Sequence, residues 1–392
     1  MSKKNEGIQK VGHLTLKKVT PGPTSAGIAP TYAVCTPDRW GLRYSDLDPD
    51  RKGQLAYPVA KSFGWKMKSM LMNEIQWGNT FLGSSKDEPK LKLDWPIDHT
   101  QFSDFVELLM PVLSEALTSP TAGFGLPVDA MPLIVPYNPT ARGEQGSFTV
   151  NYWVMSLNLA ALSDVFYDKV DTHAKAKQLG VFSNTIYHEA RHCQQAFWTY
   201  ALILQHPDNF EEIPNILKWP AAMASIYTDK STQAFKAIDL ATRAPIPADT
   251  AALISLKRLA VGSYLYTLNL WRSADHRTSW LPDSASLNEE YQRVRLVAAD
   301  LLQHVGLGGT PIDVDAMVAE PRACAADYTG RPWENDAFVC GNTAEAYWKE
   351  AMGLLLYTNP ADQCSKDYEA DYIAHQRSLG LQRDSGSTTG GQ

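Results

Sequence analysis

The chain has 392 residues, of which 44% are hydrophobic and 20% are charged, and its formal net charge is −7 at pH 7. A chain of this length and composition can bury a large core, as an ordinary globular protein does. Charges of both signs are scattered, no basic block or nucleic-acid-reading motif is present, and no apolar stretch reaches the ~20 residues of a membrane span. We therefore expect neither a nucleic acid partner nor a membrane span.

The N-terminal third is predicted to contain an arm followed by a helical lobe. Residues 1–30 include a Pro-Gly-Pro sequence that favours an extended arm. The polar N-terminus lacks an apolar signal segment, so the expected location is cytoplasmic as synthesised. Residues 31–130 are predicted to be a mostly helical lobe, with helices over 57–77 and 100–117. Five dispersed cysteines are too few for a disulfide scaffold.

The convincing β structure lies in the middle of the chain. Residues 131–137 form a short apolar run, and residues 147–155 alternate between apolar and polar, so each segment is predicted to be a strand. Turn-forming residues at 138–143 predict a hairpin between the two strands. An exposed edge of this sheet beside a metal would let an extended peptide add as another strand. The alternative is that the hairpin only covers the core.

The next predicted element is a helix over residues 183–205. Gly180 is expected to end the preceding helical stretch, Ser183 to cap the new helix, and His206-Pro207 to close it. Apolar residues at helical spacing form an expected buried stripe, and a second, polar face could line a cleft. The stripe consists of Ile186, Ala190, Cys193, Phe197 and Ala201, and the polar face of Thr185, His188, His192 and Gln195.

This helix carries the sequence His188-Glu189-Ala190-Arg191-His192. Histidines at positions i and i+4 rise from one helix face and are close enough to share one metal ion. A zinc ion bound in this way keeps an open position for water, and Glu189 can accept that water's proton. The arrangement is the H-E-x-x-H pattern of metalloproteases, although two histidines can also share a helix face without a metal.

After this motif the chain is predicted to be helical almost to its end. The Ser/Thr/Gly-rich residues 383–392 are expected to form a disordered tail. The expected fold class is therefore α+β and mainly α, with a small β-sheet before the metal-binding helix. The predicted helices span residues 248–271, 287–304, 313–325, 334–356 and 367–379.

A catalytic zinc site needs a third protein ligand. One zincin layout, with a glycine and then a third histidine after the second, is excluded because Gln195 and Trp198 hold those positions. The best candidate is Glu334. It follows Pro332, which is favourable in the first turn of a helix, and the small Ala337 one turn later allows a close helix approach.

Other side chains are candidates for supporting or alternative roles. Asp336 could orient a ligand histidine through its free ring N–H. Tyr328 or His375 could stabilise a developing oxyanion. Cys193 is predicted to face away from the metal as a core thiol. The long connection from the second histidine leaves other carboxylates open as the third ligand, namely Glu320, Glu345 and Glu350.

The pattern His188-Glu-Ala-Arg-His192 followed by Arg-Pro-x-Glu334-x-Asp-Ala337 resembles the Glu-zincin (gluzincin-like) metallopeptidases. It is similar to small bacterial zincins, including toxin- and effector-associated ones, through a few short motifs within residues 131–350. The resemblance implies a zincin-like catalytic region over 131–382, with His188, His192 and Glu334 as zinc ligands and Glu189 as general base. Arg191 and Gln194 depart from the pattern, because those positions are normally uncharged and apolar.

The leading hypothesis is a zinc metallopeptidase with a protein or peptide substrate. A second is a metal-dependent amidase acting on a non-protein or cell-wall peptide, because the same activated water serves both reactions. A third is a non-catalytic helical binding protein with a vestigial H-E-x-x-H site, marked by failure to retain zinc. The toxin-like resemblance also suggests a bacterial effector, exported by a non-classical or injection route.

Overall fold

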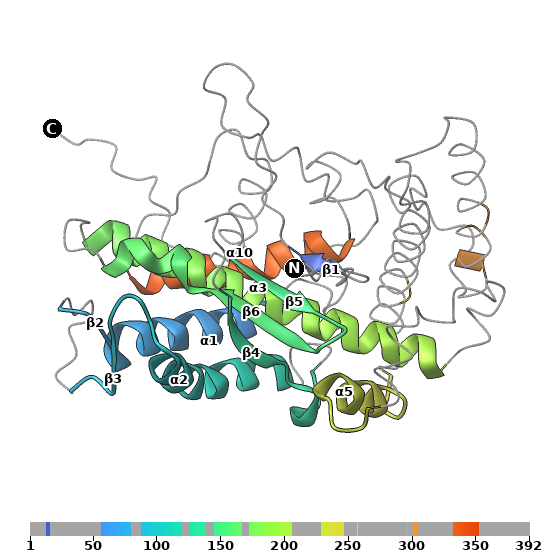
Figure 1. Ribbon diagram of the computed structural model, residues 1–392. Helices are drawn as coiled ribbons and strands as arrows, with labels where there is room; N and C mark the ends of the chain where they lie inside the picture. The colour runs from blue at the N-terminus through green and yellow to red at the C-terminus, as the bar shows by residue number, and fades with distance from the viewer. Residues whose placement is uncertain are drawn as a thin grey trace, which may run out of the picture.

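The computed structural model describes residues 13–15, 56–79, 88–119, 125–137, 145–166, 172–205, 229–246, 257, 296, 299, 302–303 and 332–352. These residues form a mixed α/β fold that is mostly helical and has two small sheets (Figure 1). The predicted mainly α character is confirmed to this extent. No helix in these ranges is long and apolar enough to cross a membrane.

Several predicted segments lie wholly or mostly outside the described residues. They are the arm at 1–30, the helices at 248–271, 287–304, 313–325 and 367–379, and the tail at 383–392. Within the described part, buried side chains from both the 31–130 and the 131–382 regions belong to one hydrophobic cluster. The boundaries between those regions remain predictions.

The longest described helix, α3 (Thr172–Gln205), contains the H-E-x-x-H sequence. The predicted apolar stripe from Ile186 to Ala201 is fully buried. The polar face is buried as well, with His188 and His192 fully enclosed, so within the described structure this face lies beneath other elements. The helix is described as far as Gln205, so the predicted stop at His206-Pro207 lies outside the described residues.

The predicted helix break at Gly180 is wrong, because α3 runs through Gly180 and Ser183 without interruption. The glycine serves close packing against α10 (Pro332–Ala351). A Cβ atom at Gly180 would lie only 2.7 Å from Cδ1 of Trp348 in α10. The Trp348 indole N–H donates to the Ala176 carbonyl at 2.9 Å, so this close approach also fixes the orientation of the ring.

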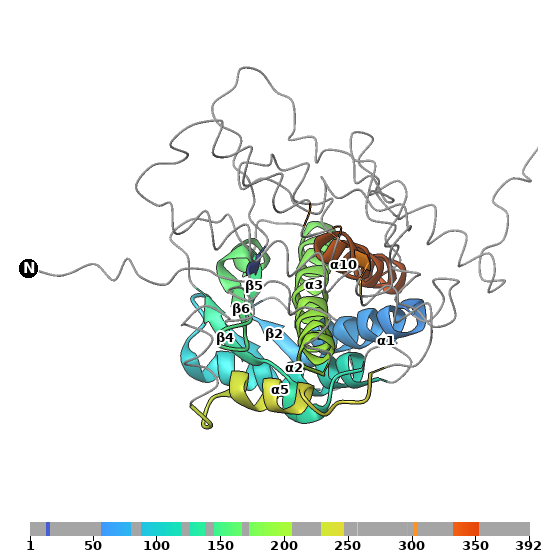
Figure 2. The ribbon, with the colours of Figure 1, turned by 90° about the vertical axis from the view of Figure 1, so that its right-hand side faces the viewer.

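Helix α10 lies along α3, and α1 (Ala56–Ser69) packs on α10 (Figure 2). A Cβ atom at Gly64 of α1 would lie 2.8 Å from the Ala344 carbonyl oxygen, which shows how closely these two helices approach. Pro332 lies in the first turn of α10, where its sequence position is favourable. Helix α2 (His99–Thr118) matches the predicted range closely and begins after Asp98, which forms a capping box with Gln101.

The predicted helix over 57–77 is confirmed in its helical part but wrong at its end. After α1 comes a π-helical segment, η2 (Met70–Glu74), and then strand β2 (Ile75–Trp77) pairs in parallel with β3 (Leu91–Leu93). Ile75 and Trp77 are buried on either side of a half-buried residue. This alternation is that of a strand, and strand pairing with β3 overrides the helical spacing of the preceding residues.

The main sheet has the strand order β1-β5-β6-β4. Its strands are β1 (His13–Thr15), β4 (Leu133–Tyr137), β5 (Gly146–Thr149) and β6 (Val154–Asn158). The predicted hairpin is wrong, because β4 pairs in parallel with β6, whereas β5 is antiparallel to β1 and β6.

A turn divides the predicted strand over 147–155 into β5 and β6. Trp153 in this turn has a φ of 54°, and its indole N–H donates to the Ala130 carbonyl at 2.7 Å. The buried tryptophan therefore holds the chain in a left-handed conformation that the apolar–polar alternation does not reveal.

Helix α3 lies between this sheet and α10 (Figure 2). Strand β5 meets α3 at Gly146, where a Cβ atom would lie 2.8 Å from Thr185 Cγ2 and 3.2 Å from Glu189 Cγ. Among the described residues, the two edge strands of this sheet are β1, which pairs with β5, and β4, which pairs with β6. The remaining elements are the 3-10 segments η4 (Val128–Ala130) and η5 (Leu159–Phe166), and α5 (Gln233–Ala241), a helix that was not predicted.

Candidate metal centre

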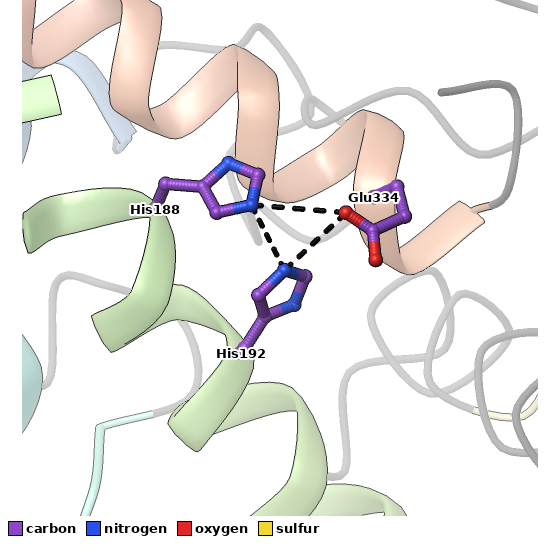
Figure 3. Close-up of side chains that lie close together, drawn as sticks. All are labelled: His188, His192 and Glu334. Atoms are coloured by element: carbon purple, nitrogen blue, oxygen red, sulfur yellow. Dashed lines mark hydrogen bonds and ion pairs between the residues drawn. The ribbon is translucent and has the colours of Figure 1, made fainter. Parts of the chain in front are cut away.

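Three side chains from two helices meet in the interior of the protein (Figure 3). His188 and His192 project from neighbouring turns of α3, and Glu334 projects from the first turn of α10. The two histidine Nε2 atoms are 2.9 Å apart, and Glu334 Oε2 lies 3.7 Å from His188 Nε2 and 3.5 Å from His192 Nε2. We call these three residues the His/His/Glu triad.

The donor atoms of this triad suit a metal ion in type and spacing. A tetrahedral zinc ion bound by nitrogen and carboxylate oxygen holds its donor atoms roughly 3.3–3.5 Å apart. The observed separations of 2.9–3.7 Å bracket that range. Glu334 Oε1 is buried and accepts no hydrogen bond, an arrangement that is costly for a carboxylate unless a cation compensates it. The triad could therefore hold a metal ion.

Burial and neighbouring charges shift the pKa values of the two histidines in opposite directions. Burial and then the charge of His192 lower the pKa of His188 well below its usual value, with the Ala337 backbone acting in the opposite sense. Burial alone would also lower the pKa of His192, but Glu334, Glu189 and Gln195 together raise it. A lowered pKa favours the neutral form of His188, which is the form of imidazole that can bind a metal ion.

Glu189 is fully buried and adjoins the triad. Its charge is one of the causes that raise the pKa of His192, so the carboxylate acts electrostatically on the triad. Its Cγ lies close to Gly146 at the start of β5. The general base predicted from the sequence therefore lies between the histidine pair and the nearest strand of the main sheet.

The sequence places Gln195 on the same polar helix face as the two histidines but predicts no specific role for it. Its Oε1 lies 2.9 Å from His192 Nδ1, and its Nε2 donates to the Trp333 carbonyl at 2.8 Å. The available signal was its position three residues after His192, on the same helix face. Asp336, the residue predicted for this role, has a side chain outside the described structure.

The two departures from the common zincin pattern form a separate polar contact. Gln194 Nε2 donates to the Leu117 carbonyl at 3.0 Å, and Arg191 Nη1 donates to Gln194 Oε1 at 3.1 Å. Both side chains are buried. They link α3 to the C-terminal end of α2, which explains why polar residues occupy these positions.

The structure also bears on the alternative ligands. Glu345 is engaged elsewhere, because its Oε1 pairs with Lys349 Nζ at 2.7 Å and its Oε2 accepts a hydrogen bond from Asn184 at 2.7 Å. Cys193 is fully buried, its thiol contacts the Ala130 carbonyl at 3.9 Å, and burial raises its pKa well above the usual value. The prediction of a core thiol is thereby confirmed. The side chains of Glu320, Glu350, Tyr328 and His375 lie outside the described residues.

Comparisons with protein-family models, curated proteins and solved structures find no match for this chain. The fold and the site alone define the class, which is a mostly helical α/β protein with a buried His/His/Glu group that could bind a metal ion.

Proposed function

We propose that this protein is a zinc-dependent metallopeptidase of the Glu-zincin type. The observation that carries the proposal is the convergence of His188 and His192 with Glu334, which lies far away in the sequence. Two histidines and one carboxylate are the protein ligands of a common class of catalytic zinc sites, which keep a further position for water. The H-E-x-x-H spacing on α3 supports the same assignment.

The roles of the residues follow from their chemistry and positions. A zinc ion held by the triad would acidify a water molecule and polarise a substrate carbonyl. Glu189, beside the triad, would accept the proton of the attacking water and deliver it to the leaving amine. Its position beside the triad supports this role, because Glu189 is fully buried there and its charge acts on His192.

The experiment is to incubate the zinc-loaded protein with an unfolded, alkylated protein substrate, in parallel with Glu189→Gln. The wild type should cleave the substrate, and a chelator should stop cleavage. Glu189→Gln should retain zinc and lose turnover by about 10²- to 10⁴-fold, the usual contribution of a general base. A zinc-loaded wild type without peptidase activity, or a variant that cleaves normally, would contradict the proposal. Cleavage of cell-wall peptides alone would assign the site to amidase chemistry.

A further inference from the structure

Gln195 lies between one of the histidines and the backbone that carries the third ligand. It is 4% exposed and bridges α3 to α10 through two contacts, to His192 Nδ1 at 2.9 Å and to the Trp333 carbonyl at 2.8 Å. Trp333 directly precedes Glu334. One amide group therefore contacts a histidine of the triad and also the residue that precedes the carboxylate of the triad.

The orientation of this amide follows from its partners. A backbone carbonyl can only accept a hydrogen bond, so the amide group that faces Trp333 must be the NH₂ group. The Gln195 carbonyl oxygen then faces His192 Nδ1. Because a carbonyl oxygen also only accepts, the neutral His192 ring must carry its hydrogen on Nδ1. Its Nε2, the atom directed at His188 and Glu334, is left with a free electron pair.

We infer that Gln195 is a positioning residue that holds His192 in the Nδ1–H tautomer and fixes the spacing between His192 and Glu334. This inference rests on the proposed zinc site, since the Nε2 electron pair is the one that a shared metal would use. Outer hydrogen bonds of this kind orient ligand imidazoles, and their loss typically weakens metal binding. In this site the same amide also donates to the first turn of α10, so it contacts both ligand-bearing helices.

The neighbouring Gln194 provides a matched control. It is equally buried and also donates to a backbone carbonyl of another helix, that of Leu117, but it makes no contact with the triad that the structure records. Gln195→Met and Gln194→Met each replace a buried amide by an apolar side chain of similar length. If zinc affinity fell only because packing is lost, it should fall in both variants. If it falls because His192 is no longer held in position, it should fall only in Gln195→Met.

The test has two readouts, and neither requires catalysis. In metal-free, ¹⁵N-histidine-labelled protein in mildly alkaline buffer, the two-bond ¹H–¹⁵N correlations of His192 should show the Nδ1–H tautomer. The signal is assigned by its absence from His192→Gln. Zinc affinity, measured by competition with a chelating dye, should fall by about 10- to 100-fold in Gln195→Met and remain near wild type in Gln194→Met.

A second variant keeps the inference testable if Gln195→Met does not fold. Gln195→Glu, as a carboxylate, can still accept from His192 but cannot donate to Trp333, so the tautomer should persist although the link to α10 is lost. An Nε2–H tautomer in the wild type, or equal zinc affinity in the wild type and Gln195→Met, would overturn the inference. The tautomer readout stands even if the protein binds no zinc or cleaves no peptide, so failure of the proposed function is recognised separately.

Discussion

Gly146 at the start of β5 lies directly against Glu189 of α3, so close that a Cβ atom on the glycine would be 3.2 Å from Glu189 Cγ. The same atom would be 2.8 Å from Thr185 Cγ2, one helical turn earlier. The main sheet therefore meets α3 at the residue proposed as the general base. The absence of a side chain at Gly146 determines how closely the strand approaches that carboxylate.

Gly146→Ala should lower turnover while leaving zinc affinity unchanged. The added methyl group must displace Thr185 or Glu189, and a misplacement of about 1 Å in a catalytic group can cost about 10²-fold in rate. The three atoms nearest to this Cβ position belong to Thr185, Glu189 and Ser156 rather than to the triad, so metal binding should be preserved. Steady-state hydrolysis and zinc competition provide the two measurements, with Ser147→Ala as the neighbouring control. Unchanged turnover would show that this contact does not position Glu189.

Glu334→Gln should weaken zinc binding strongly, because it replaces a charged oxygen ligand by a neutral amide. Glu345→Gln is the matched control on the same helix. It removes the charge of a carboxylate that pairs with Lys349 and Asn184 and is absent from the triad. Isothermal titration with zinc should separate the two variants. A loss of affinity in Glu345→Gln, with normal binding by Glu334→Gln, would place the third ligand elsewhere.

The Cys193 thiol should be inert while the protein is folded. It is fully enclosed, and burial raises its pKa, so the reactive thiolate is scarce at neutral pH. Iodoacetamide followed by mass spectrometry should modify this residue only after denaturation, and Cys193→Ala should bind zinc like the wild type. Reduced zinc content in Cys193→Ala would instead indicate that the thiol takes part in metal binding.

Gly180→Ala should destabilise the protein although alanine favours helices by about 1 kcal/mol over glycine. The new methyl group would lie 2.7 Å from Trp348 Cδ1, and overpacking of this kind costs roughly 1–3 kcal/mol. Displacement of the ring would also weaken the hydrogen bond from the Trp348 indole N–H to the Ala176 carbonyl. Urea unfolding of the single variant and of Gly180→Ala/Trp348→Phe measures the coupling. The smaller phenylalanine ring should restore part of the lost free energy of unfolding. A Gly180→Ala variant more stable than the wild type would refute this explanation.

The sequence predicted those features whose signals are local. The helix expected over 100–117 corresponds to α2, Pro332 lies in the first turn of α10, and the i, i+4 spacing places His188 and His192 on one face. The sequence predicts Glu334 in the first turn of a helix, and the structure brings it to the histidine pair.

The features that sequence analysis missed depend on residues distant in the chain. Gly180 has the signal of a helix terminator, but its function is the approach of Trp348 from α10. Turn residues after β4 suggested a hairpin, yet β4 pairs in parallel with β6, and only the buried Trp153 turn reveals the change of direction. The sequence places Gln195 on the face of the histidines, but it does not reveal the second partner of this side chain, because the Trp333 carbonyl is a backbone atom of a helix far along the chain.

The zinc content of the purified protein, compared with that of His188→Ala, tests the central claim most directly. His188 contributes a ring nitrogen to the triad from the middle of α3, so its removal should abolish tight binding without changing Glu334 or Glu189. We predict about one zinc per chain in the wild type and almost none in the variant, measured by atomic emission after zinc loading and desalting. Absence of zinc from both proteins, or equal zinc in both, would contradict the metal centre described above.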